Sequence, residues 1–356
     1  MNWLLIALFA AFLAARSDDG RSPPKPALLL HDQNEGRLLT LSDGSLALIA
    51  RDRLQFRSPA GKWSEVVKLP LDYVIESASD DSGVLVSGDQ PVSPPYVTMI
   101  FLVGVDGQIR ETWKLPDECI YSLAAWKGQR FATGLRQTFE LLPGGRIGRD
   151  LVTPTVVRYG YGPDGSLAEQ PIVPQWFHLY LGPEGEKVYC VSQQCHHDGP
   201  CHYAYCYRRD QVSWDEFGRW SQPPVGCGDY LLEPETSGSA DYYLPHHHNR
   251  TVVRRMADGI KIASVKMAQD SVIACGNDDE FLVADTSIKA FQITTGRRLW
   301  SVPVRSGTAV AVARANDCVV ALTNRGKEQH VCRQAGHSPG QNTSKILPAG
   351  SHGRNP

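Results

Sequence analysis

The sequence lacks an excess of charge of either sign. Its 36 Lys and Arg residues are balanced by 38 Asp and Glu residues, which gives a net charge of −2. Acidic and basic residues are mixed along the chain. A nucleic-acid-binding domain normally carries a basic stripe or face, and the sequence contains none. We therefore expect no nucleic-acid partner.

Long hydrophobic segments are also absent, apart from one at the start. Trp3 to Ala15 form an unbroken apolar run, which is too short to cross a bilayer as a helix. A run of this length that ends in small residues and then turns polar at Arg16 is typical of a secretory signal peptide, although no Lys or Arg precedes it. The alternative is a buried segment at a domain edge. We expect residues 1–15 to be a signal peptide, residues 16–25 to be a linker, and the protein to be secreted or periplasmic and not transmembrane.

The chain also lacks a long amphipathic helix with capping residues. Short runs rich in Val, Ile, Leu, Tyr and Phe alternate instead with Gly-containing turns, as in Arg37–Leu41, Val97–Val103 and Thr308–Ala313. Runs of this length and composition are typical of β-strands. The sequence therefore predicts an all-β fold.

The turns recur with a period, which indicates repeats. Each turn of the first set is followed directly by a predicted strand. Each turn of the second set lies upstream of a turn of the first set. The first set contains Gly61, Gly107, Gly145, Gly218, Gly259 and Gly296, and the second contains Gly44, Gly83, Gly128, Gly238 and Asp278–Asp279. Two hairpin turns in each unit of about forty residues describe a four-stranded propeller blade.

We therefore expect a single β-propeller over residues 26–335. Seven blades fit best, and eight are the alternative. The spacing between Gly145 and Gly218 is nearly double that between the other turns of the first set. This interval therefore contains either an insertion in one blade or a further blade with a turn near Gly185. Two packed β-sandwich domains are the competing architecture. The last unit, Thr308–Cys332, supplies three strands, and Ala27–His31 would close the ring as the fourth, which removes exposed sheet edges. Residues 336–356 have no apolar pattern and are expected to be disordered.

One unit resembles the PQQ-like repeat of quinoprotein-type propellers. The matching residues are Ala290, Thr295, Gly296 and Trp300, and Gln292 stands where the family has Asp. The resemblance implies that Thr295 and Gly296 form a hairpin turn and that Trp300 packs between neighbouring blades. The dehydrogenases of this family pair two adjacent cysteines near their cofactor, and this sequence has no Cys-Cys dipeptide. We therefore expect no cofactor.

Nine cysteines fit an exported protein, in which disulfides persist. Four of them lie close together, at Cys190, Cys195, Cys201 and Cys206. They are symmetric about Asp198, so a hairpin turning there would bring Cys195 to Cys201 and Cys190 to Cys206. Cys318 and Cys332 flank a predicted turn and form a third candidate pair. The sequence does not assign partners to Cys119, Cys227 or Cys275.

A metal site is the competing interpretation of the cysteine cluster. His196, His197 and His202 lie among the same cysteines, and His246–His248 are a second source of ligands. Zinc accepts both residue types, but neither tract has a standard zinc spacing, so we expect no metal.

The sequence contains no recognisable catalytic set. The first hypothesis is a non-enzymatic binding or assembly scaffold for a protein or glycan ligand, with Pro163–Pro224 as its specialised surface. The alternative is an enzyme (a hydrolase, lyase or oxidoreductase) with its site at the mouth of the propeller channel.

Overall fold

The computed structural model describes most of the chain from Pro26 to Cys332. The described residues are 26, 28, 30, 36–89, 97–116, 120–134, 137–148, 151–152, 157–161, 167–171, 174–183, 186–195, 199–208, 211–218, 223–235, 250–268, 271–277 and 279–332, with the backbone alone at 116, 121, 151–177 and 191–218. Every regular element among them is a β-strand, so the all-β prediction is confirmed. Within these ranges there is no helix long and apolar enough to cross a membrane.

Seven antiparallel sheets follow one another along the chain, and we call them blades 1 to 7. The first three are blade 1 with β1 (Gly36–Thr40), β2 (Leu46–Ala50), β3 (Arg53–Arg57) and β4 (Val67–Lys68); blade 2 with β5 (Val74–Asp80), β6 (Gly83–Asp89), β7 (Val97–Val103) and β8 (Ile109–Pro116); and blade 3 with β9 (Ile120–Trp126), β10 (Gln129–Gly134), β11 (Gln137–Leu142), β12 (Arg146–Ile147) and β13 (Leu151–Val152).

The remaining four blades have the same up-and-down order. They are blade 4 with β16 (Pro174–Leu181), β17 (Lys187–Cys195), β18 (Gly199–Arg208) and β19 (Gln211–Gly218); blade 5 with β20 (Val225–Cys227), β21 (Tyr230–Glu235), β22 (Arg250–Arg255) and β23 (Lys261–Lys266); blade 6 with β24 (Val272–Asn277), β25 (Glu280–Ala284), β26 (Ser287–Gln292) and β27 (Arg298–Pro303); and blade 7 with β28 (Ala309–Ala315), β29 (Cys318–Thr323) and β30 (Glu328–Cys332).

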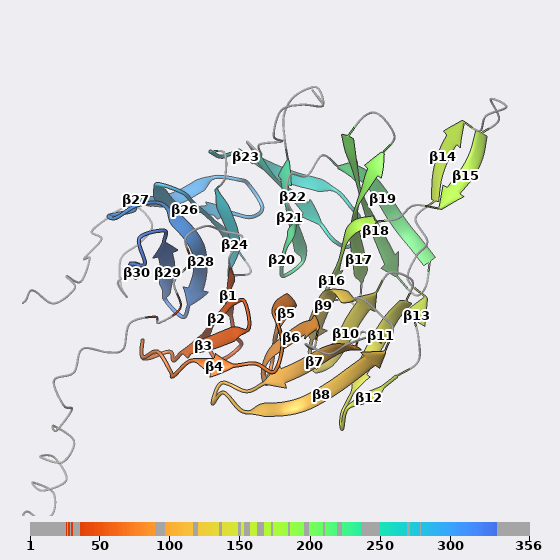
Figure 1. The fold of residues 1–356 in the computed structure, drawn as a ribbon. Helices are drawn as coiled ribbons and strands as arrows, with labels where there is room; N and C mark the ends of the chain where they lie inside the picture. Colours follow the sequence, from red (N-terminus) through yellow and green to blue (C-terminus); the bar gives the residue numbers. More distant parts are fainter. Residues whose placement is uncertain are drawn as a thin grey trace, which may run out of the picture.

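The blades form a ring (Figure 1), and the blades of a β-propeller surround a central channel. The first strand of a blade contacts the first strand of the next: β1 contacts β5, β5 contacts β9, β9 contacts β16, β20 contacts β24, β24 contacts β28, and β28 returns to β1. These first strands therefore line the channel. The molecule is a single β-propeller of seven sheets.

The doubled interval between Gly145 and Gly218 contains both features that the sequence left open. Blade 4 lies there, with the turn between β16 and β17 at the predicted place. A separate hairpin of β14 (Val157–Tyr161) and β15 (Leu167–Pro171) precedes it and forms its own two-stranded sheet. Figure 1 shows this hairpin outside the ring of blades.

The core lies between the blades, and the outer strand of blade 2 packs against blade 3. In β8, for example, Trp113 and Leu115 are buried with Leu141 of blade 3. Leu28 and Leu30 are buried in the same way, between Leu322 of blade 7 and blade 1. Blade 7 has three strands among the described residues, and the buried side chains of Leu28 and Leu30 fill the interface at which the ring closes.

Candidate functional site

An ion pair joins the channel walls of blades 1 and 2. Arg37 lies on β1 and Glu76 on β5, and Arg37 donates from its two Nη atoms to the two carboxylate oxygens of Glu76 at 2.5 and 2.9 Å. A β-bulge lies between Val74 and Glu76, and bulges commonly re-aim a side chain. The Arg37 side chain is 45% exposed and that of Glu76 is 11% exposed. Glu76 therefore holds the guanidinium of Arg37, whose side chain is the more exposed of the two.

Two aromatic side chains of blade 4 act with this pair. His178 and Tyr180 lie two residues apart on β16, so they share one face of the strand, and their rings stack with centroids 6.4 Å apart. The charges of Glu76 and Arg37 reach both rings, although β16 belongs to a blade on another side of the ring. The group that we call the channel site, Arg37, Glu76, His178 and Tyr180, therefore gathers residues from three blades.

The protonation states at the channel site follow from burial. Burial would lower the pKa of Arg37, but Glu76 raises it above its usual value, so the guanidinium stays charged. Burial lowers the pKa of His178, with Glu76 acting in the opposite direction, so this imidazole is neutral at pH 7. Burial raises the pKa of Tyr180 far above its usual value, and its hydroxyl donates to the carbonyl of Pro224. The site can bind a polar ligand, and its neutral imidazole could exchange a proton with such a ligand.

Sequence reasoning missed all four residues of the channel site. No short motif connects them, because they lie on β1, β5 and β16 and become neighbours only when the ring closes. The one signal was that a propeller collects residues of several blades at its channel.

The predicted pair of Cys190 and Cys206 is wrong, because Cys190 is a free and buried thiol. In the hairpin of β17 and β18, Cys190 faces Ala204 and Cys206 faces Val188. The predicted hairpin centre is therefore displaced by one residue, so mirror-related cysteines lie diagonally and not opposite each other. Burial raises the pKa of the Cys190 thiol well above its usual value, which makes it a poor nucleophile.

The same register separates the second predicted pair. Cys195 faces Gly199, and Cys201 faces Gln193. The side chains of these two cysteines lie outside the described residues, so their disulfide stays a prediction.

Two disulfides are present among the described residues. Cys318 and Cys332 are bonded between β29 and β30 of blade 7, where they face each other in the register, as the sequence predicted. Cys227 and Cys275 are also bonded, and this pair joins β20 to β24, the innermost strands of blades 5 and 6. The sequence could not predict the second pair, because its residues lie in different blades.

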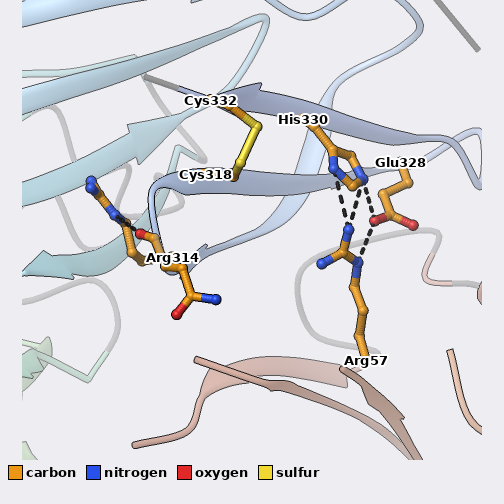
Figure 2. The surroundings of a disulfide bond; sticks show 7 residues. Arg57, Arg314, Cys318, Glu328, His330 and Cys332 are labelled. Atoms are coloured by element: carbon orange, nitrogen blue, oxygen red, sulfur yellow. Dashed lines mark hydrogen bonds and ion pairs between the residues drawn. A yellow bond between two sulfur atoms is a disulfide. The ribbon is translucent and has the colours of Figure 1, made fainter. Parts of the chain in front are cut away.

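A polar network joins blade 7 to blade 1 at the seam of the ring (Figure 2). Arg57 of β3 donates to the Glu328 carboxylate of β30 at 2.8 Å and also contacts both ring nitrogens of His330. The indole nitrogen of Trp63 donates to the other oxygen of Glu328 at 2.8 Å. Burial would raise the pKa of Glu328, but hydrogen bonds from His330 and Trp63 lower it below its usual value. These side chains hold the ring closed.

The predicted metal ligands mostly lie outside the described residues. This applies to His196, His197 and His246–His248, and to the side chain of His202. Among the residues whose side chains are described, no three His, Cys, Asp or Glu residues lie close enough to hold a metal ion.

The repeat residues of blade 6 form a tight turn. Gly296 has a φ of 66°, which a residue without a Cβ adopts at no steric cost. The Thr295 hydroxyl donates to the Gln292 side chain at 2.8 Å, so Gln292 serves the turn where the PQQ-like pattern has Asp. Trp300 packs against the core between blades 6 and 7.

Comparison with known proteins is consistent with this architecture. No family model and no curated protein sequence matches the chain. Among solved structures, BBS1N in complex with ARL6DN has a TM-score of 0.54 at 12% identity, over 86% of this chain and 94% of that chain. The WD40 β-propeller domain of Doa1 gives 0.53 at 10% identity, over 85% and 94%. The WD40 domain of Neurospora crassa Pan2 gives 0.55 at 8% identity, over 83% and 87%. These similarities support the propeller fold, without indicating the PQQ-like superfamily in particular.

Proposed function

We propose that this protein is an exported, non-enzymatic scaffold that binds a protein or glycan ligand, secreted or in the periplasm. The observation that carries the proposal is the hairpin β14–β15, which forms a sheet of its own outside the ring. A two-stranded sheet alone is marginally stable, and its unpaired edges can accept a strand from another chain. A rigid ring that carries such an element is typical of a binding protein.

Two further features support the proposal. Blade 4, which follows the hairpin, contains the longest strands of the described chain, β17 and β18, and both lie inside the Pro163–Pro224 stretch. The disulfides Cys227–Cys275 and Cys318–Cys332 fit a compartment outside the reducing cytosol.

Photo-crosslinking in the native host tests the binding surface. A photoreactive amino acid replaces Arg158 or Tyr159, which are adjacent residues of β14. The control position is Lys114, an exposed residue of β8 in blade 2. We expect a defined adduct from the hairpin and none from Lys114. Equal labelling at all three positions, or no adduct at any, would count against the proposal.

An enzyme remains the second candidate, because Arg37, which is paired with Glu76, and the buried, neutral His178 both belong to the channel site. The test is a screen of the purified protein against ester, glycan and quinone-linked alcohol substrates. Turnover that is abolished by Glu76→Gln or His178→Asn, in variants that stay folded, would replace the scaffold proposal with an enzymatic one.

A further inference from the structure

The two disulfides of the described chain differ in their access to solvent. Cys227 is 1% exposed and lies in the core between blades 5 and 6, where Cys275 is half-buried. In blade 7, Cys318 is half-buried and Cys332 is exposed. Exchange of a disulfide requires a thiolate to reach one of its two sulfur atoms. Cys332 is therefore the bonded cysteine that an outside thiolate can reach most easily.

The exposed bond holds β30 at one of its ends. Among the described residues, β30 pairs with β29 alone. At the start of β30 a tight turn connects the two strands, and the Thr323 amide donates to the carbonyl of Lys327 at 2.9 Å. At its end Cys332 faces Cys318 in the register, and the disulfide joins them. Because the ends of strands open at a lower free energy than the core, this bond prevents β30 from opening at Cys332.

The disulfide lies on the face of β30 that closes the ring. Glu328, His330 and Cys332 are spaced two residues apart, so their side chains share one face of the strand, and Figure 2 shows them in this order along β30. Arg57 of blade 1 donates to Glu328 at 2.8 Å and contacts His330 at 3.2 Å, and the Arg57 side chain is only 5% exposed. Opening of β30 from Cys332 would therefore reach the contact of His330 with blade 1 first.

We propose that the Cys318–Cys332 disulfide is exchangeable, that a dithiol protein attacks it at Cys332, and that its reduction releases β30 from the closure of the ring. One thiolate of the dithiol attacks Sγ of Cys332, forms a mixed disulfide with it and expels Cys318 as a thiolate. The second thiolate of the dithiol then attacks the dithiol's own sulfur in the mixed disulfide and expels Cys332. Two electrons pass to this protein, the two protons of the dithiol end on Cys318 and Cys332, and the dithiol becomes an intramolecular disulfide. The inference holds whether the ring is a scaffold or an enzyme.

Timed reduction of the full-length protein by reduced thioredoxin, a dithiol protein, tests the access. Each sample is quenched with acid, and its thiols are labelled with N-ethylmaleimide after denaturation and located by mass spectrometry. We expect Cys318 and Cys332 to become thiols at least about ten-fold faster than the other bonded pair, because the core shields Cys227. Equal rates, or no reduction of the Cys318–Cys332 bond in the folded protein, would overturn the proposal.

A trapping variant of thioredoxin identifies the sulfur that is attacked. Thioredoxin whose second active-site cysteine is replaced by Ser cannot complete the exchange, so the mixed disulfide accumulates. We expect mass spectrometry to find the adduct at Cys332. An adduct at Cys318 in its place would contradict an attack through the exposed cysteine.

Hydrogen exchange tests what the bond holds. The protein is compared in its oxidised form, after selective reduction of the Cys318–Cys332 bond, and as the Cys318→Ser/Cys332→Ser double variant. We expect the amides of β30 to exchange at least about ten-fold faster in the reduced protein and in the variant than in the oxidised protein. The amides of β20 and β24, which the intact Cys227–Cys275 disulfide joins, provide the control and should exchange at the same rate in all three samples.

Reoxidation guards against misfolding of the double variant. Forming the bond again in the reduced wild type should return β30 to its original rate of exchange, and added thioredoxin should leave the double variant unchanged. Exchange in β30 that does not respond to reduction, that rises equally around the ring, or that does not return on reoxidation would show that the disulfide does not control the closure.

Discussion

At the scale of single residues, a buried pair of opposite charges lies inside blade 5. Glu233 of β21 and Arg254 of β22 are almost fully buried, with Nε and Oε1 3.0 Å apart. Arg254 also donates to the carbonyl of Gly259 at 2.7 Å. Replacing one member of such a pair leaves the other as an uncompensated buried charge.

We therefore expect Arg254→Leu to destabilise the fold by about 3 kcal/mol or more. Its neighbour provides a matched control, because Arg255 pairs with Asp258 at the exposed surface and Arg255→Leu should have little effect. Urea denaturation of both variants measures the difference. Similar midpoints for the two would show that the buried pair does not stabilise the fold.

The Glu328 carboxyl makes the stability of the fold depend on pH. Its pKa is lower in the folded state than in the unfolded chain, because His330 and Trp63 hydrogen-bond to it and outweigh its burial. Its stabilising contribution is therefore fully present above the unfolded pKa of about 4.3 and is lost as pH falls through the folded value. We expect the free energy of unfolding of the wild type to exceed that of Glu328→Gln at pH 7. This difference should become smaller below about pH 4.3. A gap that stays constant from pH 7 to pH 3 would refute this.

The Cys190 thiol should be inert in the folded protein. It is buried and its pKa is raised, whereas a thiol needs access and thiolate character to react. We expect iodoacetamide to label Cys190 only after denaturation. Mass spectrometry of non-reduced peptides provides the check, and a peptide linking Cys190 to Cys206 would overturn the assignment.

At the scale of elements, one disulfide joins two blades and the other joins two paired strands of a single blade. Cys227–Cys275 joins blades 5 and 6 across 48 residues, whereas Cys318–Cys332 closes a segment of 14 residues inside blade 7. In the chain-entropy model these loops correspond to about 4 and about 3 kcal/mol of stabilisation.

Serine replacement of both cysteines of each pair compares the two disulfides. We expect the Cys227/Cys275 double variant to lose more stability in guanidinium unfolding than the Cys318/Cys332 double variant, because the larger loop restricts the unfolded chain more. The reverse order would indicate that the native contacts of blade 7 depend on its disulfide.

At the scale of the whole molecule, the ring depends on its N-terminal closure. Leu28 and Leu30 are buried between blades 7 and 1. Replacing a buried Leu by Ala costs about 2–5 kcal/mol.

We expect Leu30→Ala to lower stability within that range, and removal of residues 1–30 to open the seam. Hydrogen exchange should then rise first in β28–β30 and β1–β4. The exposed Ile260 supplies the control, since Ile260→Ala should change little. Uniform exchange around the ring in the shortened protein would show that closure does not depend on this segment.

The sequence by itself determined the all-β class, the repeat and much of the turn chemistry. Val-, Ile- and Leu-rich runs separated by residues such as Gly44 and Gly296 specify strands and hairpins locally, because strand alternation and positive φ values are properties of a few adjacent residues. The sequence also predicted the disulfide between Cys318 and Cys332, because both residues flank a single turn.

The tertiary structure decided what adjacent residues cannot specify. The register of β17 and β18 left Cys190 unbridged, because a shift of one residue in the hairpin centre moves mirror-related side chains into diagonal positions. Cys227 is bonded to Cys275, and Arg37 is paired with Glu76, only because the blades assemble side by side into a ring. Contacts between blades depend on the curvature of the whole ring, which no local pattern in the chain encodes.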